Sequence, residues 1–375
     1  EHYPTPSNYQ TKLRCCAGLQ VLKLAKVPNF NKFIKPEDVG KLINLVEDES
    51  LEVRKAFVDK LKDYIASEFI SIKFLPLVFF MAYEPDVELK SNTKTWINFT
   101  FNKESFKRGT FFERALPRLI HSIAHHPDVV ESINGNSSNY LNGLTTAIDY
   151  IIFYLDSIAN EENISLLYYL AGRIKQYVDG VKDDEEEGED DGDDGKEPEG
   201  GETCHDKSCN IYTISELAQL ILGELKEQKN WNLPVYPGKL NLPSDLFMPF
   251  ASIDEAQKNT FKTYLKEEHI KSLKTTVKVK VGHIVSKSQT QKQKLQKRKL
   301  TSEYQQSKKK ARVSKKGHNG SDDEESGDAE SADEYYVPSS RSKMDNQEPI
   351  RKSKRQKREV RYKDEDDEDS EEVLG

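Results

Sequence analysis

Apolar residues recur at intervals of three and four positions through the first 180 residues of the chain. The pattern is clear in residues 13–25, which read LRCCAGLQVLKLA, and in residues 51–61, which read LEVRKAFVDKL. This spacing places the apolar side chains on one face of an amphipathic helix. We expect further helices near residues 37–47, 71–83, 86–101, 111–126, 139–159, 162–179, 212–230 and 253–271.

The helical pattern also repeats. At an offset of 40 positions Leu13-Arg14 overlays Val53-Arg54, and a third, weaker copy follows at a different offset. This period, and an acidic turn followed by Val-Arg at 48–54, are typical of a HEAT unit. A helix pair of this kind cannot cover its apolar face alone, so pairs stack. We therefore predict an all-α fold, a HEAT-repeat α-solenoid built as a curved stack of antiparallel helix pairs, with an ordinary helical bundle as the alternative. Arg14 and Arg54 are expected to tie successive repeats to acidic turns.

Composition divides the chain, and the formal net charge of −8 hides the division because it sums blocks of opposite sign. Residues 183–202 carry thirteen Asp or Glu, one Lys and five glycines, so repulsion and backbone entropy both oppose order there. From 272 onward charged and small polar residues dominate, and too little apolar surface is available to offset the entropy of ordering. We predict helical repeats at 1–182, a disordered acidic insertion at 183–210, a terminal repeat with a packed proline-rich segment at 211–271, and a disordered tail at 272–375.

The tail carries basic clusters of the kind found in nuclear-import signals and at contacts to DNA phosphates. Residues 286–316 contain twelve Lys or Arg and one acid. A merely solvated tail is the alternative interpretation. The stretch 276–281, TVKVKV, alternates like a strand. The candidate import or DNA-contact residues are Lys297, Arg298, Lys299, Lys308, Lys309, Lys310, Arg312, Arg351, Lys352, Lys354, Arg355, Lys357 and Arg358.

Acidic blocks at 322–325 and 364–369 separate the basic clusters, and serines precede several acids. This context is favoured by acid-directed kinases, and a phosphate would add negative charge that weakens DNA binding. The candidate phosphorylation sites are Ser321, Ser326, Ser331 and Ser370.

Two clusters resemble metal sites, and we predict that neither binds a metal. His121 and His125 are spaced i, i+4 on a helix, but no Glu stands where a zinc hydrolase needs one, and helix-end histidines explain the pair. Cys204-His205 with Cys209 lacks a second pair at zinc-site spacing. Four cysteines are also too few for a disulfide framework, so a reducing compartment fits.

Phosphate-binding loops, dinucleotide-binding glycines and a nucleophile elbow are all missing from the sequence. We therefore predict no enzyme and no cofactor. No apolar run approaches the length of about 20 residues that spans a membrane, and we expect no membrane partner. Because the chain begins with Glu1 and a helix starts almost at once, we expect it to be part of a longer protein.

Four short runs make the chain recognisable: YTISELAQ at 212–219, NWN at 230–232, YPGKL at 236–240 and LPSDLF at 242–247. Together they resemble the end of the helical body in the "precocious dissociation of sisters" family of cohesin-associated regulators. The helices from Lys12 to Leu61 are similar to the C-terminal repeats of that family. The resemblance covers about residues 1–270 and matches the tail only in its charged character.

The resemblance implies a non-enzymatic HEAT scaffold on chromatin in the nucleus. It would bind cohesin subunits, including the kleisin, and work with the cohesin release factor and the cohesin acetyltransferase in maintaining and releasing sister-chromatid cohesion. It implies no contact residues within this chain. Two alternatives stay open: another nuclear HEAT scaffold, such as a transport receptor or a condensin subunit, and a DNA- or histone-binding chaperone that acts through the charged segments.

Overall fold

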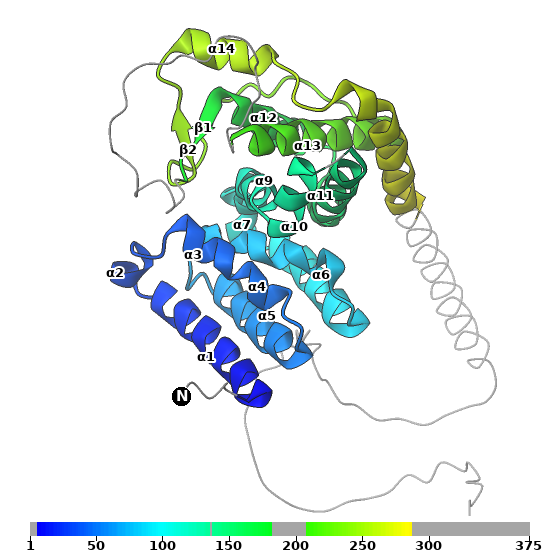
Figure 1. The fold of residues 1–375 in the computed structure, drawn as a ribbon. Helices are drawn as coiled ribbons and strands as arrows, with labels where there is room; N and C mark the ends of the chain where they lie inside the picture. The colour runs from blue at the N-terminus through cyan, green and yellow to red at the C-terminus, as the bar shows by residue number, and fades with distance from the viewer. Residues whose placement is uncertain (1–5, 136, 182–207, 287–375) are drawn as a thin grey trace, which may run out of the picture. The chain divides into compact units, whose positions relative to one another are not determined.

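The computed structural model describes residues 6–135, 137–181 and 208–286, and these residues form successive layers of helices (Figure 1). In the first layers α1 packs along α5, and α5 packs against η1 and α6. Side chains from each layer, such as Leu22, Phe57 and Phe79, are fully buried between them. The elements are α1 (Ser7–Ala25), α2 (Pro28–Asn31), α3 (Pro36–Lys41), α4 (Ile43–Val46), α5 (Leu51–Ala66), the 3-10 helix η1 (Ile72–Tyr83) and α6 (Val87–Phe101).

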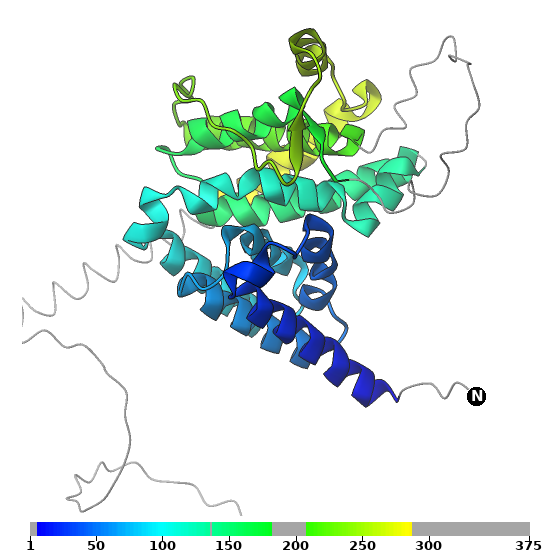
Figure 2. The ribbon, with the colours of Figure 1, turned by 90° about the vertical axis from the view of Figure 1, so that its left-hand side faces the viewer.

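The later layers continue the stack in chain order (Figure 2). Long helix α11 contacts α6 and η1 on one side and α13 on the other, so it joins the early layers to the late ones. The elements are α7 (Glu104–Arg108), α8 (Phe111–Arg114), α9 (Leu116–Ala124), α10 (Pro127–Asn134), α11 (Ser137–Ile158), α12 (Ile164–Arg173), the 3-10 helix η2 (Ile174–Gln176), β1 (Tyr177–Asp179), α13 (Ser208–Lys229), β2 (Phe247–Pro249) and α14 (Ile253–Phe261).

The all-α fold class is confirmed, with one local exception. Helix 162–179 was expected to be continuous, but α12 ends at Arg173, and Tyr177–Asp179 form strand β1. β1 pairs antiparallel with β2, and Asp179 stands opposite Phe247. The proline-rich segment packs on the body as predicted: Leu242, Leu246 and Phe247 are buried.

Residues 267–286 are helical, which corrects two predictions. Leu273, Val277, Val281 and Val285 are buried, at a spacing of four, whereas Val279 is 54% exposed. The alternating valines at 276–281 therefore lie in a helix and not in a strand, with Val277 and Val281 on its buried face and Val279 on its exposed side. This helix also contains the tail's predicted start, 272, and the acidic insertion's predicted end, 210, falls inside α13. The remainder of both segments lies outside the described residues.

Arg14 and Arg54 are structural, as their recurrence in the repeats predicted. Arg14 donates from Nε to Asp48 Oδ2 at 2.7 Å. Arg54 donates from Nε to Glu84 Oε2 at 2.7 Å and from Nη1 to the carbonyl oxygen of Asp48 at 2.7 Å. Each arginine thus binds the acidic turn that follows its own repeat, and Arg54 also binds the turn before it.

Candidate functional site

A cavity of about 290 Å³ lies between α3 and α9, closed on one side by residues 245–246. We call it the histidine pocket, because His121, His125 and His126 line it. His121 lies on α9, whose apolar residues, such as Leu119 and Ile123, are fully buried, and His125 and His126 lie in the turn between α9 and α10. None of the helices in the described ranges has the combined length and apolarity that a membrane crossing needs.

Two of the histidines share one carboxylate. His125 Nε2 lies 2.6 Å from Asp179 Oδ2, and His121 Nε2 lies 3.1 Å from Asp179 Oδ1. Asp179 Oδ1 also accepts a hydrogen bond from the backbone N–H of Val181 at 3.0 Å. Pairing of β1 with β2 fixes Asp179, and the ring of Phe247 on β2 packs edge-on against His121. The three side chains therefore converge from α9, from the residue that follows it, and from a strand more than fifty residues away.

Burial and these contacts control protonation at the cluster. Burial alone would raise the pKa of Asp179, but hydrogen bonds from His121 and His125 outweigh it and lower the pKa. Burial lowers the pKa of His121, only partly opposed by its hydrogen bond to Asp179. The cluster at neutral pH therefore holds a carboxylate and a neutral His121.

The rest of the pocket is lined by charged groups that are mostly paired. Arg118 forms a bidentate pair with Asp245, from Nη1 to Oδ2 at 2.8 Å and from Nη2 to Oδ1 at 2.6 Å. Lys73 donates to the carbonyl oxygens of Asn31 and Ile34, and burial lowers its pKa.

Two buried atoms of the pocket's lining have no hydrogen-bond partner. These are Oε2 of Glu37 and Nδ1 of His126. Leaving a buried polar atom without a partner costs about 1–3 kcal/mol. Both atoms belong to residues that line the same cavity as His121 and His125.

A second hollow, of about 550 Å³, is acidic and aromatic. We call it the acidic groove; its lining includes Glu47, Glu49, Asp128, Tyr83 and Tyr150. Tyr150 donates to Glu47 Oε1 at 2.5 Å, and Tyr83 donates to Asp149 Oδ2 at 2.8 Å. Burial, then the neighbouring carboxylates, raise the pKa of both phenols, so they remain neutral donors.

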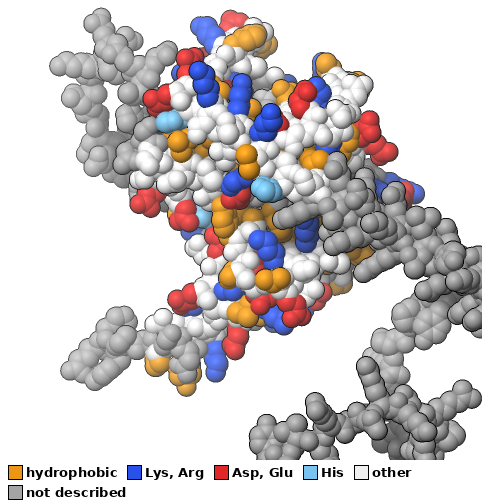
Figure 3. Space-filling view, turned by 90° about the vertical axis from the view of Figure 1, so that its right-hand side faces the viewer, with side chains coloured by type: hydrophobic (Ala, Val, Ile, Leu, Met, Phe, Trp, Pro, Cys, Tyr) orange, Lys and Arg blue, Asp and Glu red, His pale blue; other side chains and the backbone are white. Residues whose placement is uncertain are grey.

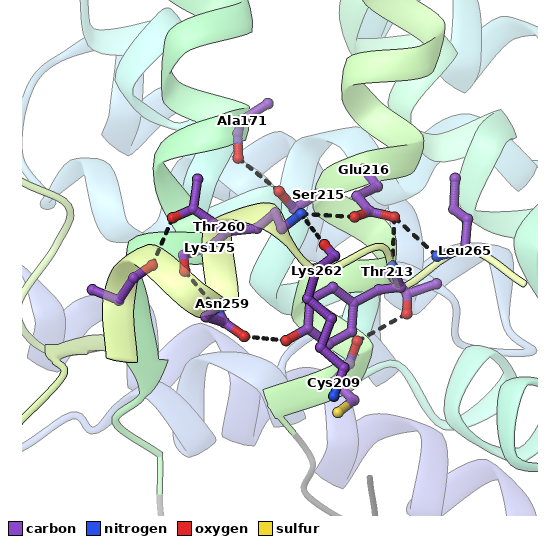
Figure 4. A network of polar contacts seen from close by, with 12 residues as sticks. Ala171, Lys175, Cys209, Thr213, Ser215, Glu216, Asn259, Thr260, Lys262 and Leu265 are labelled. Carbon is purple, nitrogen blue, oxygen red and sulfur yellow. Dashed lines mark hydrogen bonds and ion pairs between the residues drawn. The ribbon is translucent and has the colours of Figure 1, made fainter. Parts of the chain in front are cut away.

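A third polar cluster joins the last repeat to the segment after α14 (Figure 4). Glu216 Oε1 accepts from Lys175 Nζ at 2.8 Å, and Oε2 accepts from the backbone N–H groups of Tyr264 and Leu265, each at 2.9 Å. Lys175 also donates to the carbonyl oxygen of Lys262, and its own carbonyl accepts from Asn259 Nδ2 at 2.7 Å. Glu216 thus fixes the chain just before helix 267–286.

Comparison with known proteins decides the family. The chain matches the family described as sister chromatid cohesion protein PDS5 over residues 1–248. It is 60% identical to sister chromatid cohesion protein PDS5 of Saccharomyces cerevisiae over 308 residues, which are 82% of this chain and 24% of that protein. The chain belongs to the PDS5 family.

More distant PDS5 proteins match shorter parts of the chain. Sister chromatid cohesion protein pds5 of Schizosaccharomyces pombe is 29% identical over 257 residues, 68% of this chain and 19% of that protein. Human PDS5 homolog A is 25% identical over 133 residues, 32% of this chain and 10% of that protein. The chain thus spans a quarter or less of these PDS5 relatives. The family resemblance carried by residues 212–247 is confirmed, since these residues lie within the matched range.

The nuclear-import, DNA-contact and phosphorylation candidates of this PDS5 chain all lie beyond residue 286, where the described residues end. The basic clusters between 297 and 358 and the four candidate phosphorylation serines lie outside the described residues, so they stay predictions. So do Cys204 and His205. Cys209 lies in the first turn of α13, and Cys15 and Cys16 are free.

Sequence analysis missed the groups that complete the histidine pocket. Asp179, Asp245 and Glu37 come from three different segments, and no spacing rule relates them to α9. Charge on the surface gives no further guidance: on the face shown in Figure 3, basic and acidic side chains are interspersed with apolar ones.

Proposed function

We propose that this chain is part of a non-enzymatic chromatin scaffold that regulates sister-chromatid cohesion by binding cohesin. One observation carries the proposal: 60% identity, over 82% of the chain, to a sister chromatid cohesion protein. The scaffold would act in the nucleus, with the kleisin and other cohesin subunits, the cohesin release factor and the cohesin acetyltransferase as partners. Because the chain covers 24% of that relative, these partners concern the whole protein.

The architecture supports a scaffold. The buried ion pair between Arg54 and Glu84 and the partly buried contacts of Glu216 link successive helices of the same chain. Their side chains are therefore committed to fixing the repeats. A stack fixed in this way presents extended, rigid surfaces, which is how solenoid proteins bind partners.

The tail supplies the second element of the proposal. The basic clusters at 297–299, 308–312 and 351–358 would direct nuclear import and contact DNA phosphates. Phosphorylation of Ser321, Ser326, Ser331 and Ser370 would place negative charge beside these clusters and weaken DNA binding. Unchanged DNA affinity of the phosphorylated chain would contradict this regulation.

The decisive experiment compares three forms of the full-length protein in a pull-down with purified cohesin. These are the intact protein, one lacking residues 1–286, and one lacking residues 287–375 as the matched control. We expect deletion of the repeats to remove binding and deletion of the tail to preserve it. Intact binding without the repeats would place the cohesin contact elsewhere in the protein. Failure of the intact protein to bind would refute the proposed function.

The acidic groove favours one second candidate, recognition of a basic peptide such as a histone tail. Carboxylates around Tyr83 and Tyr150 suit a lysine or arginine side chain through charge and cation–π attraction. Asp128→Asn combined with Tyr83→Ala should weaken binding of a lysine-rich peptide, and exposed Glu131→Gln should not. Equal binding of the peptide by the unchanged chain, the double variant and the control would exclude this role for the groove.

A further inference from the structure

His121, His125 and Asp179 bring three potential metal ligands into one place, from α9 with its C-cap residue and from β1. We propose that they form a binding site for one divalent transition-metal ion, Zn²⁺ by preference. Among the described residues they are the one group of three His, Cys, Asp or Glu side chains arranged to hold a metal ion. The sequence offered only the i, i+4 histidine pair; strand β1 adds the carboxylate.

The spacing suits zinc with small side-chain rotations. The three ligand atoms lie within 4.8 Å of one another, and both histidines direct Nε2 at the carboxylate. Zinc bonds to nitrogen and oxygen are about 2.0–2.2 Å, which places ligands of a tetrahedral ion roughly 3.4 Å apart. The present separations of 2.6 and 3.1 Å need to open slightly to admit the ion.

A neutral imidazole binds a metal ion through one ring nitrogen and carries its proton on the other. In the metal-bound state the Nε2 lone pair of each ring would coordinate the ion, with the ring proton on Nδ1. The Asp179 carboxylate is already ionised and supplies the negative ligand. Imidazole nitrogen with one carboxylate oxygen is a ligand set that zinc accepts, whereas Mg²⁺ and Ca²⁺ prefer oxygen alone.

The pocket provides room for a fourth ligand. His121 and His125 line a cavity of about 290 Å³, so a water can complete a tetrahedral ion from that side. Glu37 lines the same cavity, and its buried Oε2 accepts no hydrogen bond from the described residues.

The ion would tie β1 to α9 at the point where the chain leaves for the acidic segment. Its role is structural: it would replace two hydrogen bonds by three coordinate bonds and hold the β1–β2 ribbon on the repeats.

The test uses the 375-residue chain, freed of metal by a chelator, titrated with Co²⁺ and Zn²⁺. We expect one ion per chain and visible ligand-field bands of tetrahedral Co²⁺ that Zn²⁺ displaces. His125→Gln and Asp179→Asn should each weaken binding at least about 100-fold, since even changes outside the ligand shell cost about 10- to 100-fold. His283→Gln, an exposed histidine on helix 267–286, is the control and should bind like the unchanged chain.

Three results would overturn the site. The first is the absence of a stoichiometric ion. The second is that both ligand variants bind the ion as tightly as the unchanged chain. The third is the appearance of thiolate-to-cobalt charge-transfer bands, which would assign the ion to cysteines. Asp179→Asn keeps an oxygen acceptor for the histidines, so it should fold, and circular dichroism would check this. Added Zn²⁺ should raise the Tm of the unchanged chain and leave that of Asp179→Asn unchanged.

Discussion

Arg14 and Arg54 bind opposite ends of the same residue: Arg14 donates to the carboxylate of Asp48, and Arg54 donates to its carbonyl oxygen, each at 2.7 Å. The two arginines stand 40 positions apart in equivalent helices. Burial would raise the pKa of Asp48, but hydrogen bonds from Arg14 and the Ser50 backbone lower it. The turn between the first two repeats is thus fixed from both sides.

Removing Arg54 should be strongly destabilising. In Arg54→Met, Glu84 keeps a buried charge with its side chain 1% exposed and loses both guanidinium hydrogen bonds. Breaking a buried ion pair costs about 3–5 kcal/mol, which denaturant unfolding would measure. Exposed Lys55→Met on the same helix is the control, expected within about 0.5 kcal/mol. If the double variant Arg54→Met with Glu84→Gln loses as much unfolding free energy as the two single variants together, the two side chains are not coupled.

The Arg118–Asp245 pair should stabilise the protein only above acidic pH. Burial would raise the pKa of Asp245, but Arg118 lowers it below the unfolded value of about 3.9. The contribution is therefore present above that value and is lost as pH falls through the folded pKa. Asp245→Asn should cost about 1 kcal/mol at pH 6, a value that allows for the partial solvent exposure of the pair, and progressively less as pH falls below about 3.9. A pH-independent cost, or an equal effect of exposed Glu131→Gln, would contradict this.

Glu216 should control the opening of the segment before the last helix. Glu216→Ala removes the acceptor for two backbone N–H groups and leaves Lys175, 9% exposed, without its carboxylate. A loss of about 3 kcal/mol would speed amide exchange at Tyr264 and Leu265 about a hundredfold. Glu227→Ala, at a position 69% exposed on the same helix, should leave that exchange unchanged.

The two faces of helix 267–286 should respond differently to charge. Val277 is fully buried and Val279 is 54% exposed. Val277→Asp should detach the helix, because an unpaired buried charge costs several kcal/mol, and limited proteolysis would cut within 267–286. Val279→Asp should resist proteolysis within residues 267–286 as the unchanged chain does. Equal cleavage of the two variants would show that the helix does not dock through this face.

Local spacing predicted the repeats, because an amphipathic helix carries its period in its own residues. Arg14 and Arg54 could be assigned for the same reason. Helix 267–286 escaped prediction because Val277, Val279 and Val281 fit both a two-residue and a four-residue period, and only packing distinguishes them. Asp179 escaped because its position depends on pairing with residues 247–249, a long-range contact without a local signal.

Tyr212 donates from its hydroxyl to the carbonyl oxygen of Tyr177 at 2.7 Å. This hydrogen bond joins the chain before residues 182–207 to the chain after them. With β1 also held by β2, the two ends of that segment are anchored whatever lies between them. Each doubling of a loop's length then costs only about 0.6 kcal/mol. A fluorescent reporter inserted between these two anchored ends should therefore leave the repeats folded.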